Sequence, residues 1–500
     1  MSEKLGQLRE ILGEVSDIGR AASVLGWDQQ VNIPPKGHEA RGQQLATLSK
    51  IAHEKATADE VGKLLDDLKE EFDGADPASD EAAMLRVASR DYDKATRVPP
   101  EFIAERAVVS SKAFEAWGEA REKSDFSIFQ PHLEKVVELV RRYVSFFPPA
   151  DHPYDTLLDD YEPGMKTAEV QAIFDELRPQ QVELIKAIAS KEQVKDDFLF
   201  VEYDEKRMID FGVDVVTKYG YDWSRGRQDK ALHPFETTFS VNDVRITTRF
   251  EEDNPTATLF STMHEAGHAM YEQGVNPAYE RTPLESGTSL AVHESQSRMW
   301  ENLVGRSLPF WEHFFPPFQK TFPSQLGDVD VKSFYKAINK VEPSLIRVNA
   351  DEATYNLHVM LRLELEIAMV EGAVEIKDLP ELWNTKMEEY LGVTPPNDAQ
   401  GVLQDVHWSG GSIGYFSTYA LGNLISAQLW EKINEDIGDL DDQIRKGNFS
   451  ELLAWLRVNI HQHGHKFEPQ TLVERVTGSK ITPDPYVRYL TTKYSDIYGL

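Results

Sequence analysis

Apolar residues recur at spacings of three and four along most of the 500-residue chain. The segment PHLEKVVELVRRYVSFF, which starts at Pro131, and the segment LVERVTGSK, which starts at Leu472, both show this period. Because an α-helix brings such positions onto one face, the pattern predicts a mainly α-helical protein. Adjacent prolines predict turns between the helices. These pairs are Pro34-Pro35, Pro99-Pro100, Pro148-Pro149 and Pro316-Pro317.

One stretch alternates apolar and polar residues instead. Residues 235–250 have the sequence FETTFSVNDVRITTRF, with Asn242 and Asp243 between two alternating runs. This predicts a small antiparallel β-hairpin, whose edge could hold an extended peptide by backbone hydrogen bonds. A helix is expected directly after it, with Asn254 as its N-cap, a proline in its first turn and an end near Gly274.

The composition excludes several classes of site and partner. Because the sequence contains no cysteine, any metal ion must be held by histidine and carboxylate side chains. The 84 acidic and 53 basic residues give a formal net charge of -31, which disfavours nucleic acid and anionic membranes as partners. No run approaches the ~18 consecutive apolar residues of a membrane span. The N-terminal residues lack the apolar region of a signal peptide, so a cytoplasmic protein is expected.

The segment STMHEAGHAMYEQG, residues 261–274, carries candidate metal chemistry. His264 and His268 are four residues apart, so on a helix both imidazoles lie on one face and can reach a single ion. Glu265 follows the first of them, where it can take a proton from metal-bound water. A catalytic zinc site has three protein ligands and leaves a fourth position for water. One further protein ligand is therefore expected.

The best candidate for this third ligand is Glu294, in the segment SLAVHESQSRMWENL. It follows His268 by 26 residues within a second helical pattern, and one carboxylate with two imidazoles is a normal hydrolytic zinc set. His293 and Arg298 are candidates for orienting the ligands, with surface or packing roles as the alternative. Three other acidic residues remain alternatives for the third ligand: Glu301, Glu272 and Glu285.

A second histidine cluster, HQHGH, contains His461 and His465 at the same four-residue spacing. Gly464 interrupts it and no carboxylate is nearby in the sequence, so it is not expected to bind a metal. His53 and His358 lie in helical patterns and are interpreted as packing or surface residues.

Six short blocks form a series along the chain. They are HPF at 233–235, DVRIT at 243–247, HEAGH at 264–268, HESQS at 293–297, IRVNAD at 346–351 and GVLQDVHW at 401–408. In these blocks and in their order, the whole chain resembles the carboxypeptidase Taq-type metallocarboxypeptidases, a family of cytosolic zinc enzymes.

The resemblance implies one zinc ion per chain on His264, His268 and Glu294, with Glu265 as the general base. Cobalt is the alternative ion for this donor set. It implies an enzyme that removes single residues from the C-termini of peptides with broad specificity, through Glu-assisted attack of zinc-bound water. It also implies a mostly helical fold with two lobes flanking a deep active-site groove, usually as a homodimer. Since no clear linker divides the sequence, residues 1–500 are expected to form one catalytic domain.

The late segment QDVHWSGGSIGYFSTYALGN offers donors for the oxyanion that forms during peptide hydrolysis. The candidates are His407, Tyr415 and Tyr419, which follow or flank a Gly-Gly turn and are expected on a loop. The resemblance to helical zinc peptidases, which use a late histidine and tyrosine in this way, supports the segment. It leaves open which tyrosine acts, and aromatic packing at a helix start is the alternative.

A carboxypeptidase must also bind the free carboxylate beside the cleaved bond, and an arginine fork suits this task. Arg347 in IRVNAD and Arg245 in DVRIT are the candidates, and the resemblance associates both blocks with the closed end of the groove. Each arginine could instead be held in a structural ion pair, for example Arg347 with Asp351 at helical spacing.

Two other functions remain compatible with the same motif. A zinc endo-oligopeptidase or a dipeptidyl carboxypeptidase of the same helical class would use identical metal chemistry, because the motif does not define where the substrate ends. A non-catalytic peptide-binding scaffold is the alternative from another class. Glu265 argues against the scaffold, since a purely structural zinc site has no use for an unligated carboxylate beside a ligand.

Overall fold

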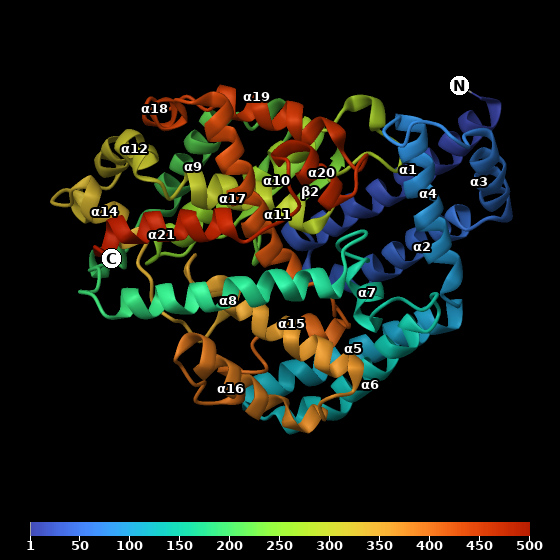
Figure 1. The fold of residues 1–500 in the computed structure, drawn as a ribbon, viewed down its shortest axis with the longest axis horizontal. Coiled ribbons are helices and arrows are strands. Elements are labelled where there is room, and N and C mark those ends of the chain that lie inside the picture. Colours follow the sequence, from blue (N-terminus) through green and yellow to red (C-terminus); the bar gives the residue numbers. More distant parts are fainter. Residues whose placement is uncertain (1) are drawn as a thin grey trace. The chain divides into compact units, whose positions relative to one another are not determined.

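The computed structural model describes residues 2–500, which contain 21 α-helices and one three-stranded sheet (Figure 1). The mainly α fold predicted from the sequence is therefore confirmed. By its internal contacts the chain divides into two compact units. The first unit comprises residues up to Thr96, Lys195–Ile338 and Leu429–Thr477, and the second comprises Arg97–Val194, Asn339–Gln428 and Gly478–Leu500.

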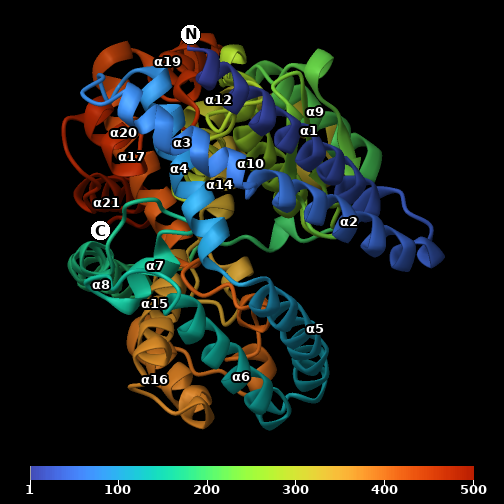
Figure 2. The same cartoon turned by 90° about the vertical axis from the view of Figure 1, so that its right-hand side faces the viewer.

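The first unit contains the sheet and most of the helices. Its helices are α1 (Glu3–Val31), α2 (His38–Ala56), α3 (Asp59–Glu71), α4 (Asp80–Arg97), α9 (Glu205–Tyr219), α10 (Pro255–Gly274), α11 (Leu290–Arg298), α12 (Leu308–Thr321), α13 (Pro323–Leu326), α14 (Val331–Ile338), α18 (Leu440–Arg445), α19 (Ser450–Asn459) and α20 (Pro469–Thr477). Leu5 and Leu8 of α1 pack with apolar residues of α3 and α4 in one core cluster. Figure 2 shows α1 and α2 side by side.

The predicted hairpin is present as β2 (Glu236–Ser240) and β3 (Asp243–Thr248), which pair antiparallel. Its turn lies one residue earlier than predicted, because Asp243 already pairs with Ser240. A strand that the sequence did not predict, β1 (Gln228–Lys230), pairs parallel with the other edge of β3. Val244 and Ile246 of the central strand are fully buried, so the sheet forms part of the core beneath the adjoining helices.

Helix α10 begins and ends as predicted. The Asn254 side chain accepts a hydrogen bond from the N–H of Ala257 at 3.2 Å, and the helix runs from Pro255 to Gly274. Proline in the first turn costs the helix nothing, because that N–H has no partner within the helix. Strand β3 ends six residues before Asn254, so the sheet leads directly into this helix.

The prediction of a turn at Pro316-Pro317 is wrong. Both prolines lie inside α12, where three phenylalanines form one buried face. The rings of Phe310 and Phe314 stack with centroids 4.4 Å apart, and Phe318 packs on Phe211 at 4.7 Å. Aromatic packing thus holds the helix despite the missing backbone donors. The other three proline pairs lie at helix starts or between helices, as predicted.

The second unit is built from long helices. They are α5 (Pro100–Lys123), α6 (Phe126–Val144), α7 (Pro153–Leu158), α8 (Thr167–Ala189), α15 (Tyr355–Glu371), α16 (Leu379–Leu391) and α21 (Asp484–Tyr498). Helix α17 (Ser417–Ile437) begins in this unit. Figure 2 shows α5 and α6 side by side, and α15 is buried along almost its whole length.

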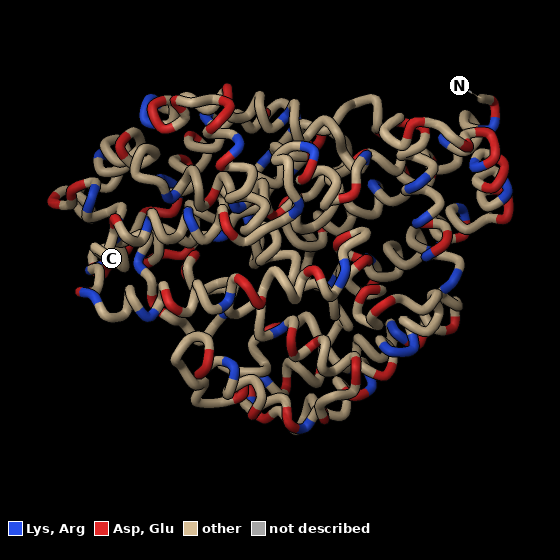
Figure 3. Tube along the Cα trace, in the orientation of Figure 1, with Lys and Arg blue, Asp and Glu red and all other residues tan. Residues whose placement is uncertain are grey.

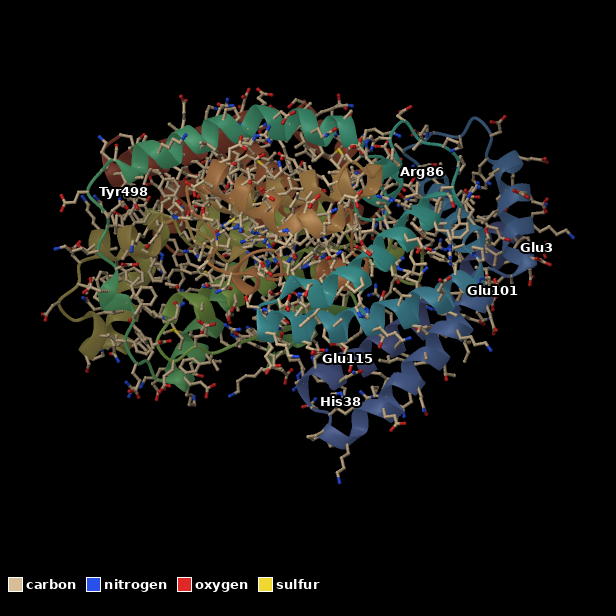
Figure 4. All side chains as sticks on the ribbon, turned by 90° about the horizontal axis from the view of Figure 1, so that it is seen from below. Glu3, His38, Arg86, Glu101, Glu115 and Tyr498 are labelled. Carbon is tan, nitrogen blue, oxygen red and sulfur yellow. The ribbon has the colours of Figure 1, made fainter. Side chains whose placement is uncertain are left out.

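Charged residues lie along the helices of both units (Figure 3). Figure 4 shows Glu3 and His38 at the first positions of α1 and α2, opposite ends of that helical pair. Helix α2 buries none of its residues, so all of its side chains remain at least partly exposed. Within residues 2–500, no helix combines the length and apolar character needed to cross a membrane.

Candidate active site

Helices α10 and α11 bring three metal-ligand side chains together. The Nε2 atoms of His264 and His268 each lie 3.5 Å from Oε2 of Glu294. All three ligand atoms lie within 4.8 Å of one another, and residues 2–500 contain no second cluster of this kind. A zinc ion with tetrahedral ligands at ~2.0–2.1 Å brings those ligands to roughly 3.3 Å of one another. The donor set and its spacing therefore fit such an ion.

Gly267 allows the two helices to approach closely enough for this arrangement. A Cβ atom at this position would lie 2.7 Å from Cα of Ser297 and 2.8 Å from the carbonyl oxygen of Gln296. Any side chain here would push α11, and Glu294 with it, away from the histidines. The start of α11 is fixed by Ser289, whose hydroxyl accepts the N–H of Val292 at 3.1 Å.

Each ligand is held from behind by a further side chain. Nδ1 of His264 lies 2.8 Å from Oε2 of Glu301, and Nδ1 of His268 lies 2.6 Å from Nδ1 of His293. Arg298 donates to Oε1 of Glu294 at 2.7 Å, which turns the other carboxylate oxygen toward the histidines. The candidates predicted to orient the ligands, His293 and Arg298, thus contact them directly.

The alternative third ligands have other partners. Glu301 lies in a π-helical segment, Met299–Val304, and also binds Arg298 at 3.2 Å. Glu272 pairs with His293 at 2.9 Å, and Glu285 accepts a hydrogen bond from Ser16 of α1 at 2.6 Å. None of the three belongs to the metal-ligand cluster.

The electrostatics of the cluster favour a cation. Burial alone would lower the pKa of His264, but Glu294 and Glu301 outweigh it and raise that pKa to about 8. Burial alone would raise the pKa of Glu294, but Arg298 and His264 outweigh it and hold the pKa well below its usual range. A cation bound between these groups would experience the same favourable field.

Glu265 is the buried carboxyl group beside the cluster. Its side chain is buried, and no residue in the described part of the chain hydrogen-bonds to it. Burial raises its pKa to about 7, with His264 lowering it and Glu236 raising it further. A carboxylate with a pKa near neutrality can both accept and return a proton at that pH.

The HQHGH segment, which was not expected to bind a metal, places a histidine in the core beside α11. His461 is fully buried, and its Nε2 lies 2.9 Å from Oε1 of Gln296, in α11. It does not belong to the metal-ligand cluster. His358 is also fully buried, in α15, which agrees with its interpretation as a packing residue.

Arg245 is held on β3 by three neighbours. It forms two hydrogen bonds of 2.8 Å with Asp243, and its guanidinium group lies between the rings of Trp27 and Phe239 at 4.4 and 4.9 Å. The bidentate pair uses the same fork that a substrate carboxylate would need. This geometry favours the structural ion pair over a role of Arg245 in binding a substrate carboxylate.

Arg347, in the second unit, is also paired, but with Asp405 and Tyr355 rather than with Asp351. Asp351 instead accepts backbone N–H groups, including that of Thr354 at 3.0 Å. Arg347 binds Asp405 through Nε at 3.2 Å and Nη2 at 2.8 Å, and Tyr355 through Nη1 at 2.8 Å. The four-residue spacing of Arg347 and Asp351 does not bring them together, because Arg347 lies in a three-residue 3-10 turn rather than in an α-helix. These bonds use three of its five N–H groups.

His407, Tyr415 and Tyr419 come together in the second unit. The rings of His407 and Tyr415 lie 5.4 Å apart, and the Tyr415 and Tyr419 hydroxyls lie 3.4 Å apart. Tyr419 is in the first turn of α17 rather than on the expected loop. Burial and nearby Arg347 lower the pKa of His407 to about 4, although Asp405 opposes this shift, so its ring is neutral at pH 7.

Two residues that organise this cluster were not predicted from the sequence. Arg362 is fully buried and binds Asp405 at 2.7 Å, and Gln404 accepts the N–H of Arg347 at 2.8 Å. A single arginine in the apolar segment LHVMLRLELEI was the available signal, because a buried guanidinium group requires a partner.

Comparison with known proteins identifies the chain. A family model described as the carboxypeptidase Taq (M32) metallopeptidase matches residues 7–494. The chain belongs to this carboxypeptidase Taq family. Membership makes it a metallopeptidase of the carboxypeptidase type, and a metal ion is implied by the family.

Relatives of the carboxypeptidase Taq family match over nearly their full length. Thermostable carboxypeptidase 1 of Thermus thermophilus is 42% identical, covering 98% of each chain, and carboxypeptidase 1 of Bacillus subtilis is 37% identical over the same shares. The crystal structure of an M32 carboxypeptidase from Deinococcus radiodurans R1 has a TM-score of 0.97, 42% identity and full coverage of both chains. A Pyrococcus furiosus carboxypeptidase structure has a TM-score of 0.96 and 38% identity, covering 99% of each chain.

Proposed function

We propose that this carboxypeptidase is a zinc enzyme that removes single amino acids from the C-termini of peptides, with broad specificity. The convergence of His264, His268 and Glu294 beside the buried carboxyl group of Glu265 is the observation that carries the proposal. Two imidazoles and one carboxylate suit zinc better than magnesium or calcium, which prefer oxygen ligands throughout. Cobalt is the alternative ion for the same donor set.

Bound zinc would supply a nucleophile from water at neutral pH and polarise the scissile carbonyl. Glu265 would take a proton from the attacking water and return it to the departing amine. Its pKa of about 7 suits both transfers. Glu301 and His293 would keep the Nδ1 sides of the two histidines occupied, so that both present Nε2 to the metal.

The remaining roles fall to residues of the second unit. His407, Tyr415 and Tyr419 would donate hydrogen bonds to the oxyanion that develops on the peptide carbonyl. Neutral His407 has a ring N–H to donate. Arg347 would bind the free C-terminal carboxylate of the substrate, because two of its N–H groups are not used by Asp405 and Tyr355. Arg245, whose fork is occupied by Asp243, is the less favoured alternative.

We further propose that residues 1–500 act as one catalytic domain and that the enzyme works in the cytoplasm as a homodimer. The lack of a linker supports the single domain, and the family resemblance supports the cytoplasmic homodimer. Size-exclusion chromatography with light scattering tests the dimer directly.

Digestion of one peptide and its C-terminal amide, followed by mass spectrometry, tests the reaction. Wild type should release single residues stepwise from the free acid only. A chelator should stop the release, and zinc should restore it. Glu265→Gln should retain the metal but lose activity by roughly 10²- to 10⁴-fold.

Other outcomes lead to other conclusions. Internal cleavage of both peptides would indicate an oligopeptidase, and release of dipeptides would indicate a dipeptidyl carboxypeptidase. Zinc bound at one ion per chain without any cleavage would favour a peptide-binding scaffold.

A further inference from the structure

Glu366 is a fully buried carboxyl group of the second unit that the proposed reaction does not use. Its Oε2 accepts hydrogen bonds from the Tyr154 hydroxyl at 2.7 Å and the Gly414 N–H at 3.0 Å, and its Oε1 accepts from the Trp408 indole at 2.8 Å. Within residues 2–500, no lysine or arginine forms an ion pair with it. A buried carboxylate without a cationic partner is costly, so a role beyond simple packing is indicated.

Two of its three donors belong to the loop that carries the candidate oxyanion donors. Trp408 directly follows His407, and Gly414 directly precedes Tyr415. One carboxylate therefore fastens both ends of the loop to α15, with one oxygen on each end. The third donor, Tyr154, comes from α7 and is not part of the loop.

The loop backbone is shaped to make this contact. Gly411 and Gly414 have φ angles of +72° and +103°, in the left-handed region that glycine adopts most readily. A Cβ atom at Gly414 would lie 2.7 Å from the carbonyl oxygen of Leu157. The loop thus passes directly against the end of α7, where its N–H reaches Glu366.

His407 depends on this loop for its position. Its buried Nδ1 has no hydrogen-bond partner in the described part of the chain, and the nearest carboxylate oxygen, on Asp405, is 3.9 Å away. Its ring is instead placed by its backbone and by contacts with Phe416 and Tyr415, whose centroids lie 4.6 and 5.4 Å away. A loop held at both ends fixes the backbone and Tyr415 together.

We infer that Glu366 is a positioning residue that sets the orientation of His407 and Tyr415 for catalysis. The inference rests on the function proposed above. Burial raises the pKa of Glu366 to about 7, although all three hydrogen bonds lower it. The protonated form can donate its O–H to the Tyr154 oxygen and still accept from Trp408 and Gly414, so both loop contacts persist in either state.

Substitution of Glu366 by glutamine tests the two loop contacts separately from the Tyr154 contact. An amide offers one acceptor oxygen, and its NH₂ group cannot accept a hydrogen bond. Glu366→Gln must therefore lose either the Trp408 or the Gly414 contact, whichever way the amide is turned. Tyr154→Phe is the matched control, because it removes an equally buried hydrogen bond to the same carboxylate and leaves both loop contacts in place. Trp408→Phe removes the Oε1 contact alone.

The test compares these variants as zinc-loaded full-length enzymes. We expect kcat for a free-acid peptide to fall on the order of 10- to 100-fold in Glu366→Gln and Trp408→Phe, with KM changed much less. Their double variant should be no slower than the worse single variant. Without the Trp408 indole, the amide oxygen is free to accept from the Gly414 N–H, so only one of the two loop contacts is lost. Tyr154→Phe should stay within about 3-fold of wild type, although its thermal midpoint falls similarly. Zinc content should remain unchanged in all of them.

A second readout does not depend on activity. In enzyme labelled with ¹⁵N-tryptophan, one of the nine indole signals should disappear in Trp408→Phe and shift in Glu366→Gln, but stay in place in Tyr154→Phe. Equal loss of kcat in Tyr154→Phe and Glu366→Gln would overturn the inference, as would a shifted indole signal with unchanged kcat. If His407→Ala leaves kcat unchanged, the proposed role of His407 fails, which is a separate result.

Discussion

The Nδ1 atoms of His268 and His293 lie 2.6 Å apart, and Nε2 of His293 lies 2.9 Å from Oε1 of Glu272. Only one of the two facing nitrogens can carry the shared proton. A metal ion on Nε2 of His268, the atom 3.5 Å from Glu294, requires that this nitrogen carry a lone pair and that the proton between the rings belong to His268. Nδ1 of a neutral His293 can accept that proton while its own N–H at Nε2 is donated to Glu272. The relay from Glu272 through His293 is thus suited to support the tautomer that binds a metal ion.

Removing this relay should weaken metal binding. We expect His293→Phe to lower zinc affinity by roughly 10- to 100-fold, measured by competition with a chromogenic chelator. Glu272→Gln should have a smaller effect, because its amide oxygen can still accept from His293. His463→Phe, which changes a histidine outside the cluster, serves as the control. An unchanged affinity in His293→Phe would show that His268 needs no such support.

The close approach of α10 and α11 makes a second prediction. Gly267→Ala places a Cβ 2.7 Å from Cα of Ser297, so it should destabilise the protein by about 1–3 kcal/mol and weaken zinc binding as well. Gly19→Ala is the control within the same unit, because nothing lies within 4 Å of a Cβ there. In the interior of α1, that change should stabilise the protein by about 0.5–1 kcal/mol. Urea unfolding measures both, and equal effects would contradict the packing argument.

The parts of the site predicted from the sequence depend on local spacing. The cap at Asn254, the proline beside it and the four-residue spacing of His264 and His268 all act within one helix, so the sequence predicted the start of α10 and its end near Gly274. The hairpin was predicted because its strands are joined by a short turn and alternate in polarity. Strand β1, with only three residues and no alternation, carries no such signal.

The missing parts depend on contacts between distant residues. Arg347 pairs with Asp405, 58 positions later, rather than with a neighbour four positions away. Glu366 receives donors from 212 residues before it and from 42 and 48 residues after it. No periodicity marks such partners, because tertiary packing alone brings them together. The helical proline pair in α12 is another case where packing overrides a local signal.

Removal of the metal should lower the free energy of unfolding, by an amount that depends on the side chains that bind the ion. Because a folded metal site binds zinc far better than the unfolded chain, zinc at 100 times its Kd should add about 2.7 kcal/mol to the free energy of unfolding. Glu294→Gln should reduce this gain, since it replaces a ligand that two histidines approach. Calorimetry with and without a chelator measures the effect. A thermal midpoint that does not respond to zinc in wild type would argue against a preformed site.

The buried Glu366 should make stability depend on pH. Its pKa rises from 4.5 to about 7 on folding, through burial, with Arg362 on the same helix opposing the shift. A raised carboxyl pKa stabilises the fold below pH 4.5, and the contribution is lost as the pH rises through about 7. Relative to Glu366→Gln, wild type should lose about 3 kcal/mol of unfolding free energy across that window. Urea titrations at several pH values test this, and parallel curves for the two proteins would contradict it.

Recognition of the substrate carboxylate can be assigned by comparing the two paired arginines. Lysine keeps the positive charge of arginine but cannot form a two-pronged hydrogen bond with a carboxylate. Lysine at the position that binds the substrate carboxylate should therefore lower kcat/KM for a free-acid peptide by roughly 10- to 100-fold. We expect this loss in Arg347→Lys, whose parent side chain has two N–H groups beyond those bound to Asp405 and Tyr355. Arg245→Lys should mainly lower stability, because Asp243 occupies its fork and Trp27 and Phe239 pack on it. The ratio of free-acid to amide cleavage separates recognition from general damage. A collapse of that ratio in Arg245→Lys, with Arg347→Lys unchanged, would reverse the assignment.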